Sequence, residues 1–185
     1  MADDPIEPPA VGAPRPVAPS PSTVLRLDDD ERVYAAGEGY RIVQWRNVLF
    51  THWFAPVSIV GLEASEDGSF DLARRHPKLV VFNVIEYGLQ FPATDVRRKA
   101  TSVLAATEDH VDVVATVLPG EGFWASTARA AVATITLLSK ARHPHKVFGT
   151  TEDAAAWTLS HVRPGHTPLS HLTRALTRLT ARASA

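Results

Sequence analysis

The chain has 185 residues, 45% of them hydrophobic, and a formal net charge of −1. This length and composition suffice for one domain with a buried core, and the near-zero charge gives no overall attraction to nucleic acid or to an anionic membrane. The sequence contains no cysteine, which excludes disulfides and thiolate metal sites.

Charge is distributed unevenly along the chain. Residues 1–31 contain seven acids and two arginines, whereas residues 163–185 contain four arginines and no acid. Such charged segments favour contact with a partner or with each other, but two solvated tails are an equally good interpretation. We predict that residues 1–32 form a disordered, proline-rich acidic arm, because prolines and small spacers cannot build a core.

The first ordered segment is predicted to begin near residue 40. Residues 41–45 and 48–54 are strand-like and are separated by Arg46 and Asn47, which indicates a β-hairpin with a two-residue turn. Within residues 56–77, helical spacing relates Ile59, Leu62, Glu66, Phe70 and Ala73, although Gly61 and Gly68 each cost about 1 kcal/mol relative to alanine. We predict a helix here and leave open a break at residues 67–68.

Helices and strands alternate in the rest of the domain. Residues 78–86 are apolar at both parities, which is typical of a buried strand in a parallel sheet. Thr94 or Asp95 is a natural cap for the next helix. Further strands are predicted at 112–118 and 146–149, with helices at 123–141 and from Thr150 or Thr151 to residue 162. The sequence therefore predicts an α/β domain with a mixed, mostly parallel sheet, an N-terminal hairpin and about four helices.

The chain contains no predicted membrane span or secretory signal. Its most hydrophobic run, residues 123–138, is too short for a bilayer of about 30 Å and contains Arg129. The acidic start of the chain lacks the basic and apolar regions of a secretory signal. We therefore expect a cytoplasmic protein.

The order of elements suggests a family when it is combined with two stretches, LVVFNVIEYGLQFPATDVRR at residues 79–98 and HPHKVFGTTEDAAAWTLSHV at residues 143–162. Together they resemble the STAS-like domains, named for sulphate transporters and anti-sigma factor antagonists, and in particular the small bacterial SpoIIAA-like branch. In that branch, a terminal strand that begins with an aromatic leads through a short acidic turn into an Ala-rich helix with a Trp. The resemblance covers residues 40–162 and implies a STAS-like fold and a non-enzymatic module that binds a protein partner or sometimes a small ligand.

The resemblance also implies a candidate switch. In the anti-sigma factor antagonists of this family, a serine at the start of the second helix is phosphorylated to break the partner complex. The matching loop here lacks the family's Asp-Ser-Ser-Gly type signature, and Thr94 is the nearby hydroxyl. A phosphate on Thr94 would be stabilised by the helix dipole and by Arg97 or Arg98. The simpler interpretation is that Thr94 is an N-cap.

Four residues at strand ends and in loops are candidate ligand or partner contacts: Asn83, Glu86, Gly120 and Gly122. Successive residues of a strand face opposite sides, so Asn83 and Glu86 cannot form one simple pair. Glu86 is a candidate to bind a ligand or to accept hydrogen bonds from loop amides. For Asn83, the simpler interpretation is a core residue with satisfied hydrogen bonds.

Sequence motifs for catalysis and for metals are absent. The loop at residues 119–122 precedes a helix, and its amides can face an anion, but it lacks the Lys-Ser/Thr of a P-loop and Glu121 would repel phosphate. His143 and His145 have no third ligand at a recognisable spacing. We therefore expect no catalytic residue, no metal and no cofactor, although a site that only the fold assembles leaves no motif.

Residues 163–185 are predicted to form a basic amphipathic helical tail. Its leucines lie in one stripe and its arginines in an adjacent line, at Leu169, Leu172, Leu176 and Leu179 and at Arg174, Arg178 and Arg182. This stripe can dock on its own domain, on a partner helix or second copy, or on an anionic surface. The tail has no interleaved aromatics, so the signal for nucleic acid is weak.

These patterns favour a cytoplasmic, non-enzymatic regulatory or scaffolding module that binds a protein partner and is a candidate for homo-oligomer formation. The alternative is a small-ligand-binding or enzymatic α/β domain that uses the strand-end loops near Glu86, Thr94 and Gly120.

Overall fold

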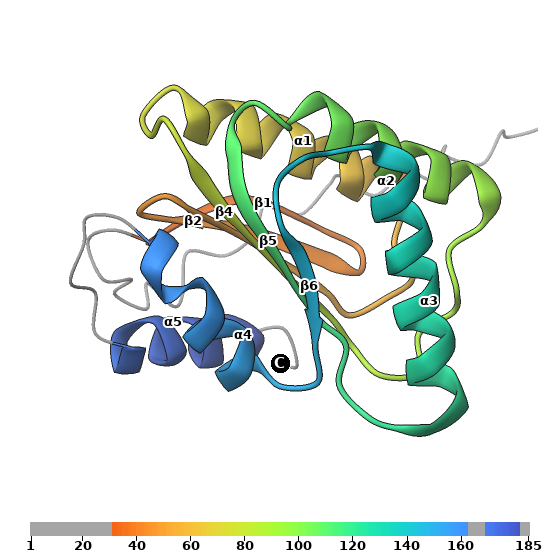
Figure 1. Cartoon of the computed structure of the whole chain (residues 1–185). Coiled ribbons are helices and arrows are strands. Elements are labelled where there is room, and N and C mark those ends of the chain that lie inside the picture. The colour runs from red at the N-terminus through yellow and green to blue at the C-terminus, as the bar shows by residue number, and fades with distance from the viewer. Residues whose placement is uncertain (1–30, 163–168, 182–185) are drawn as a thin grey trace, which may run out of the picture.

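The computed structural model describes residues 31–162 and 169–181 of the chain (Figure 1). Six strands form one sheet in the same order as in the sequence. The first three strands pair antiparallel and the last four pair parallel, so the sheet is mixed. The strands are β1 (Glu31–Gly37), β2 (Tyr40–Trp45), β3 (Val48–Trp53), β4 (Leu79–Ile85), β5 (Val111–Val117) and β6 (His145–Phe148).

Helices cover both faces of the sheet. They are α1 (Ile59–Ala73), α2 (Thr94–Ala106), α3 (Gly122–Ser139), α4 (Thr151–Thr158), a short 3-10 helix (Leu159–His161) and α5 (Leu169–Ala181). The three helices that connect the parallel strands, α1, α2 and α3, lie on one face, and α4 and α5 lie on the other (Figure 1). In the described part of the chain, none of the helices has both the length and the apolar character needed to cross a membrane.

The strands bury side chains on both faces, as the apolar composition of β4 and β5 predicts. On one face, Phe50 belongs to a cluster that includes Leu172 and Leu176 of α5. The neighbouring Leu49 points to the other face and belongs to a cluster with Leu62 of α1. This alternation gives two cores separated by one sheet, which is the layered α/β arrangement predicted from the sequence.

The predicted N-terminal hairpin is confirmed. Strands β2 and β3 pair antiparallel, with Trp45 opposite Val48 and a two-residue connection between them. Arg46 in this turn has a φ of 52°, the left-handed conformation that tight hairpin turns require. Because β3 then pairs parallel with β4, the hairpin extends one side of a sheet that is otherwise parallel.

Helix α1 runs from residue 59 to residue 73 without a break at residues 67–68. Its two glycines allow the helix to approach the sheet closely. A Cβ atom at Gly61 would lie 2.6 Å from the Trp53 ring, and one at Gly68 would lie 3.0 Å from the Tyr34 ring. The helix therefore gains packing against the sheet where it loses intrinsic helix propensity.

The sheet begins earlier than the predicted start at residue 40, because β1 precedes the hairpin and pairs with β2. Residues 31 and 32, which we assigned to the disordered arm, belong to this strand, whereas residues 1–30 lie outside the described residues. Strand β1 is an edge strand, and most of its residues are at least partly exposed. It therefore lacks the apolar run by which the other strands were recognised.

Helix starts were predicted with mixed success. The Thr150 hydroxyl caps α4 by accepting a hydrogen bond from the backbone amide of Asp153 at 3.2 Å, as expected. The expected cap of α2 at Thr94 or Asp95 is wrong, since the N-cap residue is Ala93, which has no capping side chain. Thr94 is instead the first helical residue.

Candidate functional site

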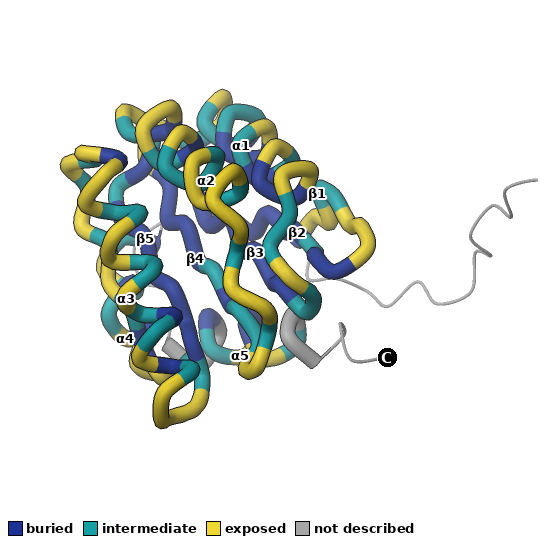
Figure 2. The backbone as a smooth tube through the Cα atoms, turned by 90° about the vertical axis from the view of Figure 1, so that its right-hand side faces the viewer, coloured by how far each residue is buried: buried dark blue, intermediate teal, exposed yellow. Residues whose placement is uncertain are grey.

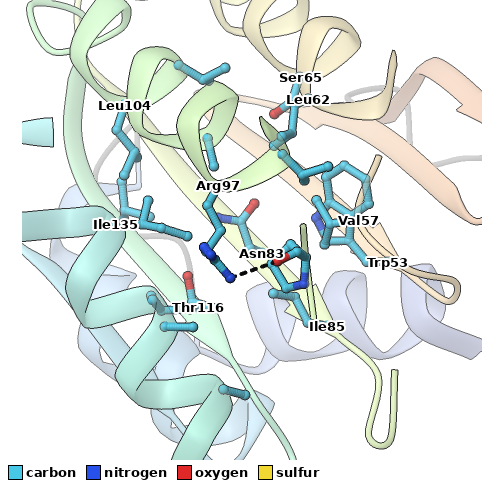
Figure 3. Close-up of a pocket in the computed structure, with 18 of the residues that line it drawn as sticks. Trp53, Val57, Leu62, Ser65, Asn83, Ile85, Arg97, Leu104, Thr116 and Ile135 are labelled. Carbon is cyan, nitrogen blue, oxygen red and sulfur yellow. Dashed lines mark hydrogen bonds between the residues drawn. The ribbon is translucent and has the colours of Figure 1, made fainter. Parts of the chain in front are cut away.

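A cavity that is partly open to solvent lies beneath α1, α2 and α3. Its volume is about 150 Å³, and it lies between these helices and the face of strands β3 to β6 (Figure 3). Most of the lining is apolar, and it includes Leu62, Val81, Leu104, Val114, Val132 and Ile135. Because protein interiors are normally packed as densely as organic crystals, a space of this size is a specific feature of this face.

The side chains that α2 and α3 direct toward the sheet explain the cavity. Ala100, Ala128 and Ala131 line it beside the larger Leu104, Val132 and Ile135, so only part of the helical lining consists of small methyl groups. Val103 is the only buried residue of α2. Figure 2 shows the contrast, with α2 and α3 mostly exposed or intermediate in colour and the strands beneath them mostly buried.

A row of polar side chains crosses the middle of the sheet on the cavity side. Asn83 of β4 is in register with Thr51 of β3 and with Thr116 of β5. Asn83 and Thr116 line the cavity. The Thr51 hydroxyl is buried and has no hydrogen-bond partner, and among the described residues the Asn83 amide makes no side-chain hydrogen bond. The expectation that Asn83 is satisfied within the core is therefore not met.

The hydrogen bonds of His145 fix its neutral form at the β6 side of the cavity. Its Nδ1 lies 2.7 Å from the Thr136 hydroxyl, which itself donates to the carbonyl of Val132. Nδ1 is therefore the donor to Thr136, and Nε2 accepts from the Thr116 hydroxyl at 2.9 Å. Burial, and secondarily the charge of His143, lower the pKa of His145 to about 4. The cavity wall is consequently uncharged here at neutral pH.

Three aromatic residues form a cover over one end of the cavity, and we call Tyr87, Phe91 and Trp124 the aromatic cover. The ring of Trp124 lies 4.9 Å from that of Tyr87 and 6.2 Å from that of Phe91. Its Nε1 donates to the carbonyl of Leu89 at 2.9 Å, which attaches the loop after β4 to the start of α3. Since Tyr87 and Phe91 are exposed, the cover lies between the cavity and solvent.

Arg97 supplies the positive charge at the cavity. In Figure 3 its side chain extends from α2 into the space that Asn83 and Thr116 also face. The guanidinium donates to the carbonyl of Pro92 and to the hydroxyl of Thr94, both at 3.1 Å. Among the residues that the structure describes, no carboxylate pairs with it. Arg97 was predicted as a partner of a phosphate on Thr94, and the structure brings these two side chains together.

Glu86 lies away from the cavity. Its carboxylate is 3.1 Å from Nε2 of His52, a buried residue whose ring neighbours Phe50 in the core beneath α4 and α5. Burial lowers the pKa of His52, and the adjacent Glu86 acts in the opposite direction. Asn83 and Glu86 therefore serve opposite faces of the sheet, as predicted from strand parity.

The two candidate glycines lie beside the aromatic cover. Gly120 has a φ of +89°, and a Cβ atom there would collide with the Tyr87 ring. The carbonyl of Gly120 accepts a hydrogen bond from Arg129 at 3.2 Å. Gly122 is the first residue of α3, whose N-cap Glu121 makes no capping hydrogen bond. Gly120 is thus explained by the close approach of Tyr87, and neither glycine lines the cavity.

Helix α5 docks on its own domain. Leu172 and Leu176 are buried in the core beneath it, while Arg174 is exposed. Arg178 forms an ion pair of 2.7 Å with Glu31 of β1, whose side chain is fully buried. The two ends of the described chain therefore contact each other through opposite charges. Leu169 and Leu179 belong to α5 without described side chains, and Arg182 lies outside the described residues.

The described residues contain no cluster of three or more histidine or acidic side chains placed to hold a metal ion. Comparisons with protein-family models, with curated proteins and with solved structures find no match. The sequence did not indicate the cavity, the pairing of Thr116 with His145 or the role of Trp124. Its one usable signal was that Asn83 interrupts an otherwise apolar strand and that Thr116 interrupts the apolar run of the next strand.

Proposed function

We propose that the protein binds a small, mostly apolar molecule in the cavity beneath α1, α2 and α3. The observation that carries this proposal is an apolar space that borders the unpartnered amide of Asn83. The cavity is partly open to solvent, and each Å² of its apolar lining that stays in contact with water forgoes roughly 25 cal/mol of burial free energy. A ligand of matching shape recovers this free energy when it binds.

The cavity limits the size of the ligand. An engineered apolar cavity of about 150 Å³ in another protein holds a benzene molecule. The space here is of similar size, so it fits one ring or a short branched chain. Larger molecules require the aromatic cover to move. Ligand pockets that are mostly apolar with a few polar groups are the usual form of small-molecule sites, and this cavity has that form.

Thermal unfolding in the presence of toluene tests this proposal. Saturating toluene is expected to raise the melting temperature, because a ligand that binds only the folded state stabilises it by mass action. Ala131→Phe places a ring in the cavity and is expected to abolish the toluene shift. The control is Ala130→Phe, since residue 130 is exposed on the same helix. The absence of a shift in both the wild type and this control would contradict the proposal.

A second candidate function is the regulatory protein-binding module predicted from the STAS-like resemblance. The observation that favours it is the exposed apolar C-terminal end of α3, where Leu137 and Leu138 are 78% and 63% exposed. Exposed apolar groups of this kind mark interaction surfaces in many proteins. Sedimentation of the wild type and of Leu137→Glu tests whether the protein associates with a second copy of itself through α3. A homo-oligomer that becomes monomeric in the variant supports it, and a monomer in both cases contradicts self-association through α3.

A further inference from the structure

The polar groups at the cavity indicate the chemical class of its ligand. Resting on the proposed function, we propose that the ligand is a small apolar carboxylic acid whose carboxylate binds Arg97 and Asn83. The apolar part of this acid, about the size of one ring, occupies the space between the sheet and α1, α2 and α3.

The first argument is the state of the Arg97 guanidinium. It has five N–H donors in a planar fork, and its two hydrogen bonds go to neutral oxygens of Pro92 and Thr94. The neighbouring Lys99 differs, because its ammonium is 2.7 Å from the carboxylate of Glu66. Arg97 therefore has donors and positive charge available at the cavity, and carboxylates match its fork best.

The second argument is the Asn83 amide, which lines the same cavity from the opposite, sheet side. Its NH2 group supplies two donors, and among the described residues it makes no side-chain hydrogen bond. A carboxylate has two oxygens, so one can accept from Arg97 while the other accepts from Asn83. Figure 3 shows the two side chains directed from α2 and β4 into one space.

The third argument limits the charge of the ligand. Both ring nitrogens of His145 are engaged by threonines, and the imidazole is neutral. The remaining cavity wall is mostly apolar, so a second anionic group would have no cation to pair with. A ligand ammonium would face the cationic Arg97. The cavity thus favours a monoanion with an uncharged, apolar body.

Isothermal titration with benzoate and with toluene tests this inference, because the two probes share a ring and differ in the carboxylate. We expect benzoate to bind the full chain at least about tenfold more tightly than toluene, as charge-assisted hydrogen bonds are the strong ones. Arg97→Gln is expected to lower benzoate affinity much more than toluene affinity and so to remove this preference. Arg98→Gln is the matched control, because both arginines are exposed on the same turn but only Arg97 lines the cavity.

The outcomes separate the two proposals. If toluene binds and benzoate binds no more tightly, the carboxylate inference is overturned and the apolar cavity stands. Equal losses of benzoate affinity in Arg97→Gln and Arg98→Gln would also overturn it, since they would indicate a general electrostatic effect. If neither probe binds, the proposed function fails as well. Retained toluene binding in Arg97→Gln shows that the cavity is intact in that variant, and Arg97→Lys is expected to keep an intermediate preference.

Discussion

Helices α4 and α5 cover one face of the sheet and α1, α2 and α3 cover the other, but the two faces are packed differently (Figure 1). Beneath α5, Leu172 and Leu176 interdigitate with large strand residues such as Phe50. Beneath α2 and α3, three alanines lie among larger apolar residues, and the cavity remains next to Asn83. The face beneath α4 and α5 stabilises the fold through close packing. The face beneath α1, α2 and α3 contains the cavity and the polar side chains of Asn83 and Thr116. Under the proposed function, the packed face stabilises the fold and the cavity face binds the ligand.

The largest effect is expected from polar substitution on the packed face. Leu172→Asp or Leu176→Asp removes a fully buried side chain and places a carboxylate in the core, so each should lower the free energy of unfolding by about 4 kcal/mol or more. Urea unfolding followed by circular dichroism measures this change. Arg174→Asp, on the exposed side of the same helix, should change stability by only about 0.5 kcal/mol. Similar unfolding midpoints for all three variants would show that α5 is not a structural part of the domain.

The protonation of His145, which lines the cavity, should make the stability of the protein depend on pH. The folded-state pKa of His145, about 4, is below its ordinary value of 6.5, so the unfolded state binds more protons between these pH values. This residue therefore contributes a loss of about 3 kcal/mol in unfolding free energy as the pH falls through that window. His145→Asn should remove this part of the slope. Parallel pH profiles for the variant and the wild type would contradict the neutral assignment of His145.

A smaller loss is expected when the ion pair between the two ends of the described chain is broken. Arg178→Leu removes the ion pair from the buried carboxylate of Glu31, and we expect a cost of about 2 kcal/mol because Arg178 is itself partly exposed. Adding Glu31→Gln to this variant should recover part of the loss. Arg174→Leu is the control on the same helix. If the double variant is no more stable than Arg178→Leu, the buried carboxylate is not the cause.

The smallest expected effect concerns the aromatic cover. Gly120→Ala combines an unfavourable φ of +89° with a collision at the Tyr87 ring, whereas Gly88→Ala has a similar φ of +81° and open space around it. We expect a loss of about 1 kcal/mol for Gly88→Ala and a larger loss for Gly120→Ala, together with faster ligand exchange. Thermal unfolding and NMR exchange rates measure the two effects. Identical behaviour of the two variants would show that Tyr87 is not packed on Gly120.

Much of the fold could be predicted because it depends on local patterns. The hairpin around Arg46 and Asn47, the buried strand β4 and the cap at Thr150 each leave a signal within a few residues. Strand β1 left none, because most of its residues are at least partly exposed and its pairing with β2 has a register shift between Val33 and Ala35.

The candidate site was harder to predict because it depends on packing between distant elements. Asn83 was noticed as a polar residue in an apolar strand, but its lack of a partner depends on which helix side chains lie above it. His145 was considered only as a metal ligand, whereas Thr116 and Thr136 determine its state. The volume of a cavity depends on how far the helices lie from the sheet and on how completely side chains fill the space between them. No pattern of neighbouring residues in the sequence contains this information.

Crystallography under xenon pressure tests the central claim most directly, because xenon occupies apolar cavities of this size without needing a polar contact. We expect a xenon atom among Leu104, Val132 and Ile135, above the side of the sheet that carries Asn83, and no xenon beneath α4 and α5. Ala131→Phe should exclude it from the cavity, and Ala130→Phe should not. A wild-type crystal in which this space is filled by side chains and no xenon binds would contradict the account of the two faces.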